Sequence, residues 1–131
     1  MKLGWCDVCL NVEDLEASKN FYETFGFEVV EGDVKRKYYV MKNGTARIGL
    51  YKEAFEGFML NFRGGDVLVN SAILKEKGVD FHSGPEEGKD GGASAMILDP
   101  DGNMIFLDTH PDELEPEYQK KVGVLPHLID E

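Results

Sequence analysis

The sequence predicts an α+β fold in which one unit, a strand followed by a helix and three further strands, occurs twice in tandem. Apolar residues follow the two-residue period of strands and the 3.6-residue period of helices in this order in each half of the chain. Two turn sequences, Asn43-Gly44 and Asp99-Pro100-Asp101-Gly102-Asn103, lie late in the two halves, each between a pair of apolar runs. Short stretches also match in order, such as Leu10-Asn11-Val12 with Leu60-Asn61-Phe62.

The first unit is expected over residues 1–52. Residues 3–12 alternate between two faces as a strand does, and Asp14 then caps a helix that Gly26 ends. Three short strands are expected at residues 27–30, 37–42 and 46–51. The last two are joined by Asn43-Gly44, a sequence typical of a two-residue hairpin turn. The order in this half is therefore βαβββ.

The second unit is expected over residues 57–110. A strand at residues 58–62 precedes a helix that is capped near Asp66 and ends at Gly78, and a further strand follows at residues 79–82. The last two strands, at residues 95–98 and 104–107, are joined by the Asp99–Asn103 turn. Residues 84–92 are rich in glycine and charge, which indicates a surface loop or a mobile lid.

The remaining residues, 111–131, are expected to add an acidic C-terminal helix and a tail. Residues 116–121 have helical character, and an apolar tail follows at residues 124–129. This tail is expected to dock on the body of the protein or on a partner.

The composition favours a soluble, cytoplasmic protein with a core of its own. The 131 residues are 42% hydrophobic and 11% aromatic, enough to bury a core. The formal net charge of −11 leaves no basic surface for a nucleic acid. No apolar run reaches the roughly 20 residues that span a bilayer. We therefore expect neither a nucleic acid nor a membrane as a partner.

Cys6 and Cys9 form a Cys-x-x-Cys motif, but the motif lies in the first expected strand. Residues three apart in a strand point to opposite faces and lie roughly 10 Å apart. Two such thiols can neither form a disulfide nor share a metal. We expect both to be reduced and structural, as is usual in the cytosol.

The repeated unit resembles the vicinal oxygen chelate superfamily in two further motifs, residues 12–22 at the start of the first helix and the Asp99–Asn103 turn. This superfamily includes glyoxalase I, bleomycin-resistance proteins, fosfomycin-resistance transferases and extradiol dioxygenases. The resemblance covers roughly residues 1–110. It implies two units whose curved mixed sheets surround a cleft, in which the enzymes of the family hold a divalent metal through His or Glu side chains.

The positions of those metal ligands fall, in this sequence, on Asp7, Gly49, Gly57 and Phe106. Only Asp7 offers a donor atom, whereas a transition-metal site generally needs three or more protein ligands. The resemblance therefore implies a member with no metal at these positions and no cofactor. The histidines are interpreted as surface or strand-end residues (His82, His110 and His127). A different metal arrangement using Asp7, Cys9 or His110 stays open.

Strand alternation places a mostly apolar wall with a few polar groups beside Asp7, a composition common in ligand pockets. Its members are Trp5, Asp7, Cys9, Arg47, Tyr51, Met59, Asn61 and Phe106. By the likeness to bleomycin-resistance proteins, we expect a metal-free protein that sequesters an amphipathic or aromatic small molecule, oriented by Asp7 and Arg47.

Two other interpretations of this face stay open. One is a lyase, isomerase or dioxygenase-type enzyme in which Asp7 is the general base. The other is a face that serves only as packed core or as a dimer interface. We also expect a homodimer, because open sheets leave edge strands that a second copy can cover.

Overall fold

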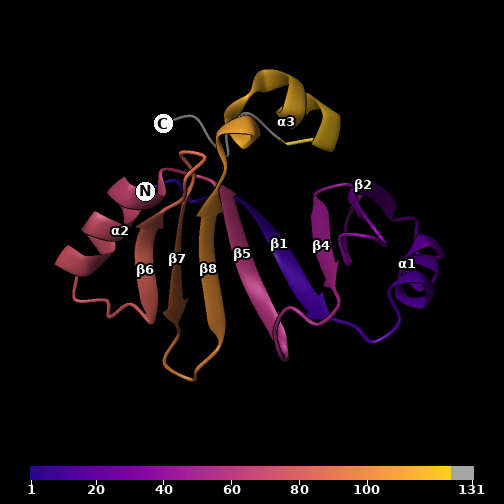
Figure 1. Cartoon of the computed structure of the whole chain (residues 1–131), viewed down its shortest axis with the longest axis horizontal. Coiled ribbons are helices and arrows are strands. Elements are labelled where there is room, and N and C mark those ends of the chain that lie inside the picture. The colour runs from indigo at the N-terminus through magenta and orange to yellow at the C-terminus, as the bar shows by residue number, and fades with distance from the viewer. Residues whose placement is uncertain (125–131) are drawn as a thin grey trace. The chain divides into compact units, whose positions relative to one another are not determined.

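The computed structural model describes residues 1–124, and the predicted α+β class with its repeated βαβββ order is confirmed. A 3-10 helix, η1, and a short α-helix, α3, follow the second repeat (Figure 1). In chain order the elements are β1 (Gly4–Asn11), α1 (Leu15–Glu23), β2 (Glu28–Asp33), β3 (Tyr38–Asn43), β4 (Ala46–Tyr51), β5 (Phe58–Gly64), α2 (Val67–Glu76), β6 (Ser83–Glu87), β7 (Ala93–Leu98), β8 (Met104–Thr109), η1 (Pro111–Leu114) and α3 (Pro116–Val122).

The chain divides into two compact units, and the division falls within β1. One unit consists of residues Asp7–Met59. The other consists of Met1–Cys6 together with the chain from Leu60 onward. We call them the Asp7 unit and the Arg63 unit and describe each by itself.

The Asp7 unit is a four-stranded mixed sheet in the order β2-β3-β4-β1. Strand β1 runs parallel to β4, whereas β2–β3 and β3–β4 are antiparallel. Helix α1 begins where the Asp14 carboxylate accepts the N–H of Ala17 at 3.0 Å. It covers one face of the sheet, and the core between them consists of Leu15, Tyr39, Met41 and Leu50. The opposite face of the sheet is therefore not covered by α1.

The Arg63 unit repeats this plan in the order β5-β8-β7-β6. The turn between β7 and β8 forms as expected, since the Asp99 carboxylate accepts the backbone N–H groups of Asp101 and Asn103. Figure 1 shows α2 lying beside β6, and the helix contacts β6, β7 and β8. Its side chains enclose a second core, made of Val67, Ala95, Ile97 and Leu107.

The sixth strand was predicted in the wrong place, at residues 79–82, and observed at Ser83–Glu87. Val79 and Phe81 alternate because both pack against the core of this unit, not because they lie in a strand. The Gly84-Pro85 pair, which indicated a loop, is accommodated in a bulged edge strand beside β7. The expected loop is correspondingly shorter.

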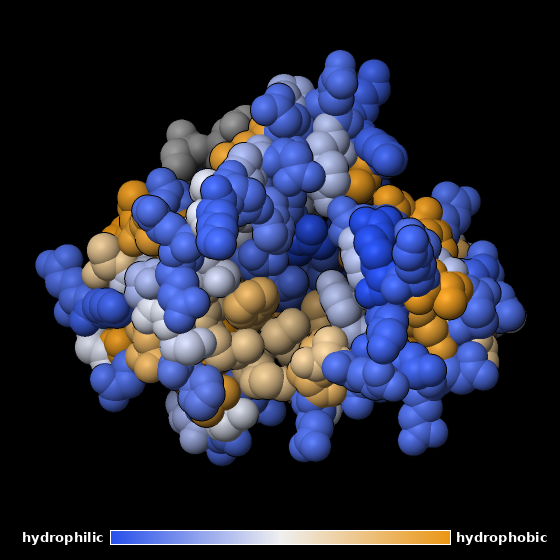
Figure 2. Space-filling view, viewed as in Figure 1, coloured by the Kyte–Doolittle hydropathy of each residue, from blue (hydrophilic) through white to orange (hydrophobic). Residues whose placement is uncertain are grey.

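The chain beyond β8 forms η1 and α3, and Gly123 ends α3 in the left-handed conformation at φ 74°. The expected tail at residues 124–129 lies, apart from Val124, outside the described residues. Within residues 1–124, no helix is long and apolar enough to span a bilayer. The face in Figure 2 is largely hydrophilic with scattered hydrophobic patches, and the large exposed apolar side chains include Phe21 and Phe25.

Candidate functional site

A buried ion pair lies on the face of the Asp7 unit that α1 leaves open. Because β1 and β4 are parallel with Cys9 opposite Gly49, Asp7 and Arg47 reach the same face. The Arg47 Nε–H donates to Asp7 Oδ1 at 2.6 Å. The Asp7 residue is fully buried, and Arg47 is 7% exposed. Both charges are thus removed from water, and each compensates the other.

Next to this pair, the sheet surface is closed by aromatic rings. The ring of Tyr51 lies over Gly49, where an added Cβ would come within 2.6 Å of Tyr51 Cε2 and 3.1 Å of Cys9 Sγ. Tyr51 stacks on Tyr38 with ring centroids 5.4 Å apart and an angle of 8° between the planes. A side chain at position 49 therefore has no room, and this position cannot supply a ligand to a metal.

The aromatic column extends beyond the two tyrosines at both ends. Phe55 lies 5.7 Å from the Tyr51 ring, and the Arg36 guanidinium lies 5.3 Å from the centroid of Tyr38. The Tyr38 hydroxyl donates to Glu31 Oε2 at 3.2 Å. The result is an aromatic column that has the Arg36 guanidinium over Tyr38 at one end and the tilted ring of Phe55 at the other, with the Glu31 carboxylate as an acceptor beside it.

The structure assigns the predicted site residues to both units. In the Asp7 unit, Asp7, Cys9, Arg47 and Tyr51 share the strand face just described, and Met59 is buried. The other three predicted residues belong to the Arg63 unit, where Trp5 and Asn61 are buried and Phe106 is half-buried. The Asp7 unit alone therefore contains the candidate pair and its aromatic neighbours.

The Arg63 unit contains a second buried ion pair, which sequence reasoning missed. Arg63 Nε lies 2.7 Å from Glu113 Oε2, with the side chains 8% and 1% exposed. Burial raises the pKa of Glu113 above its usual value, and the positive charge of Arg63 opposes that shift without cancelling it. Extending the alternation of the fifth strand by one residue would have placed Arg63 on the same face as Asn61.

Glu113 belongs to a cluster with Asp108 and His110, and one donor atom from each residue lies within 4.8 Å of the others. His110 Nε2 is 3.6 Å from Asp108 Oδ1, and Nδ1 is 3.1 Å from Asp90 Oδ2. Burial lowers the pKa of His110, but the hydrogen bond to Asp90 and the charges of Asp108 and Glu113 outweigh it. The net effect raises the pKa of His110 above 6.5.

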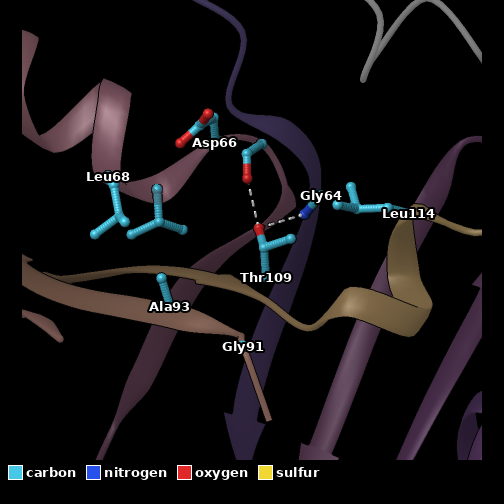
Figure 3. Close-up of a pocket in the computed structure, with 9 residues that line it drawn as sticks. Gly64, Asp66, Leu68, Gly91, Ala93, Thr109 and Leu114 are labelled. Carbon is cyan, nitrogen blue, oxygen red and sulfur yellow. Dashed lines mark hydrogen bonds between the residues drawn. The ribbon is translucent and has the colours of Figure 1, made fainter. Parts of the chain in front are cut away.

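A cavity of about 330 Å³ lies where β5 leads into α2 (Figure 3). The Thr109 hydroxyl accepts the Gly64 N–H at 3.1 Å and donates to the Gly65 carbonyl at 2.7 Å. The Asp66 carboxylate accepts the N–H of Val69 at 3.1 Å and caps α2. The Thr109 hydroxyl and the Asp66 carboxylate therefore already form hydrogen bonds to backbone groups, and we interpret the cavity as structural. The lining residues are Gly64, Gly65, Asp66, Val67, Leu68, Gly91, Ala93, Thr109 and Leu114.

Comparison with known proteins identifies a family that this chain matches. A family model described as the Glyoxalase/Bleomycin resistance protein/Dioxygenase superfamily matches residues 2–107. No curated protein matches the chain.

Solved structures show the same fold at low sequence identity. A glyoxalase/bleomycin resistance protein/dioxygenase superfamily member from Vibrio splendidus 12B01 has a TM-score of 0.65 and 16% identity, covering 79% of this chain and 97% of that one. A variant of Streptomyces coelicolor methylmalonyl-CoA epimerase in complex with 2-nitronate-propionyl-CoA has a TM-score of 0.62 and 21% identity, covering 85% and 99%. A structure named as an NAD-dependent benzaldehyde dehydrogenase from Legionella pneumophila has a TM-score of 0.64 and 19% identity, covering 80% and 98%.

Proposed function

The chain belongs to the glyoxalase/bleomycin resistance protein/dioxygenase superfamily, and from this premise we propose that it binds an amphipathic or aromatic small molecule on the strand face of the Asp7 unit. The proposed site contains no metal at the strand positions that the enzymes of the superfamily use. The observation that carries the proposal is the buried Asp7–Arg47 ion pair beside the rings of Tyr38 and Tyr51.

Two features of this face argue against a metal at the usual positions. The only donor there is Asp7, and its carboxylate is compensated by the Arg47 guanidinium at 2.6 Å. A cation would have to displace that guanidinium and leave it buried without its partner, which costs several kcal/mol. At Gly49, the ring of Tyr51 takes up the space of a ligand side chain. Binding by contact and hydrogen bonding fits these residues better than coordination.

The neighbouring groups favour a neutral or cationic aromatic ligand. Aromatic faces carry a negative partial charge, so the Tyr38 and Tyr51 rings attract flat apolar molecules and cations. The net charge of −11 disfavours the approach of anions, although salt screens this effect beyond about 8 Å. Arg47, the more exposed member of the pair at 7%, can then donate to the polar end of the ligand, while fully buried Asp7 holds the guanidinium in place.

A thermal-shift screen of aromatic compounds with and without a cationic group tests the proposal, followed by calorimetric titration of each hit. We expect a hit to lose at least tenfold in affinity in Tyr51→Leu and in Asp7→Asn. The matched control is Tyr22→Leu, which removes a ring of α1 that packs against the core on the opposite face of the same unit. A hit with unchanged affinity in Tyr51→Leu and Asp7→Asn would show that this face is not the site.

A further inference from the structure

The stretch that follows β8 brings three metal-ligating side chains to one side of the chain. Asp108 and His110 are two residues apart in extended backbone and point the same way. The 3-10 turn of η1 then returns Glu113 to His110, because positions three apart are eclipsed in such a turn. The backbone N–H of His110 donates to Glu113 Oε1 at 2.8 Å and holds the carboxylate there.

The distances match those between ligands of one metal ion. Zinc bonds to nitrogen and oxygen are about 2.0–2.2 Å long, which places two ligands of a tetrahedral ion about 3.3–3.6 Å apart. His110 Nε2 and Asp108 Oδ1 are 3.6 Å apart, and all three donor atoms lie within 4.8 Å of one another. A contraction of about 1 Å is sufficient to bring the third donor to the same ion.

A carboxylate outside the cluster orients the histidine as a ligand. Asp90 Oδ2 lies 3.1 Å from His110 Nδ1 and can accept a proton held there, which would leave Nε2, 3.6 Å from Asp108 Oδ1, to bind a cation. Ligating histidines in metal sites usually donate their other ring N–H to a carboxylate in this way. The half-exposed imidazole leaves a path for the ion to enter.

The burial of Glu113 is a second, independent observation. Its side chain is only 1% exposed, and its Oε2 forms a buried ion pair with Arg63 Nε at 2.7 Å. Oε1 accepts the backbone N–H of His110 and keeps a second lone pair that can bind a cation, so Arg63 need not be displaced from Oε2. Asp90, Asp108, Glu113 and Arg63 together have a formal charge of −2, which a divalent cation would neutralise.

We propose that Asp108, His110 and Glu113 bind one divalent transition-metal ion, of the class of Zn²⁺, with Asp90 and Arg63 as outer partners. Three protein ligands of this type leave a fourth position for water or another small ligand. The site lies wholly in the Arg63 unit and is separate from the face proposed to bind the small molecule.

Titration of the dialysed full-length protein with Zn²⁺ by calorimetry tests this proposal, with the visible spectrum of added Co²⁺ as a second measurement. We expect one ion per chain and a loss of affinity of more than about 100-fold in Asp108→Asn and His110→Ala. In Asp90→Asn we expect a loss of about 10–100-fold, as for other outer partners. The matched control, Asp112→Asn, removes the same charge from an acid in η1 outside the cluster and should stay within about twofold.

Three results would overturn the proposal. The first is that the wild-type protein binds no Zn²⁺ at micromolar concentration. The second is that Asp108→Asn and Asp112→Asn lose equal amounts of Zn²⁺ affinity. The third is that the Co²⁺ spectrum is unchanged by His110→Ala. Circular dichroism identifies any variant that fails to fold, and exposed His110 gives the readout least subject to that failure. Asp7→Asn should leave Zn²⁺ binding unchanged, so this proposal and the proposed function can fail separately.

Discussion

Breaking the Asp7–Arg47 ion pair from either side is expected to destabilise the protein by about 3–5 kcal/mol, the usual cost of leaving one buried charge without its partner. The attraction in the intact pair is of the same order. At an effective dielectric constant near 20, two unit charges separated by the observed 2.6 Å attract each other by about 6 kcal/mol before desolvation is counted. Both side chains are almost fully buried, so solvent screens this attraction little.

A double-mutant cycle separates the pair from the packing of its members. We expect Asp7→Asn and Arg47→Met each to lower the free energy of unfolding by about 3–5 kcal/mol. The double variant should lose less than the sum of the two by about 2–3 kcal/mol, because neither charge is then left alone. Urea unfolding at 25 °C, followed by circular dichroism, measures all four proteins.

The m-value serves as an internal check on this cycle. If it stays constant, the differences reflect stability and not a change in the unfolded ensemble. A coupling energy below about 0.5 kcal/mol with constant m would refute the reasoning, since it would mean that the two charges do not depend on each other.

Three further predictions follow from the structure. Gly49→Ala should destabilise by about 1–3 kcal/mol because the new methyl group overlaps Tyr51, and the cost measured by urea unfolding should shrink in a Tyr51→Ala background. Hydrogen bonds from the side chain and backbone of Asn103 lower the pKa of Asp99 below 3.8. The stability that Asp99 adds is therefore present above pH 3.8 and lost as the pH falls through its folded pKa, so the advantage over Asp99→Ala should vanish in acid melts. Sedimentation should show a homodimer, because β2 and β6 end the strand orders of their units as edge strands; a single species near 14.7 kDa at micromolar concentration would contradict this.

Much of the fold could be predicted because its signals are local. The Asp99–Asn103 turn uses a proline at one position and a glycine with φ 86° at another, and both requirements are visible in the residue types. Alternation likewise assigns Asp7 to the face of Cys9 in β1 and Arg47 to the face of Tyr51 in β4, and the parallel pairing of Cys9 with Gly49 makes these one face. The sixth strand was predicted at the wrong residues because Val79 and Phe81 alternate in order to pack against the core, and packing outside a strand can produce the same pattern.

The second ion pair could not be predicted in the same way, because its geometry depends on a turn that periodicity does not reveal. Glu113 reaches Arg63 only because η1 bends the chain directly after β8. The signal available in the sequence is the spacing Asp-x-His-x-x-Glu at Asp108, His110 and Glu113. That spacing predicts a cluster only when the backbone from Asp108 to His110 is known to be extended and the residues up to Glu113 are known to form a 3-10 turn.

The internal repeat offers a test of whether the fold itself requires the Asp7–Arg47 pair. Matching the turns and strands of the two halves sets Gly57 against Asp7 and Met104 against Arg47. Met104 lies in β8 of the Arg63 unit and Gly57 precedes β5, and the Arg63 unit still forms the same four-strand plan, so the plan does not depend on an ion pair at these positions. A buried ion pair is often no more stabilising than apolar residues of similar size. We therefore attribute the pair to the binding role proposed for this strand face and not to a requirement of the sheet for folding.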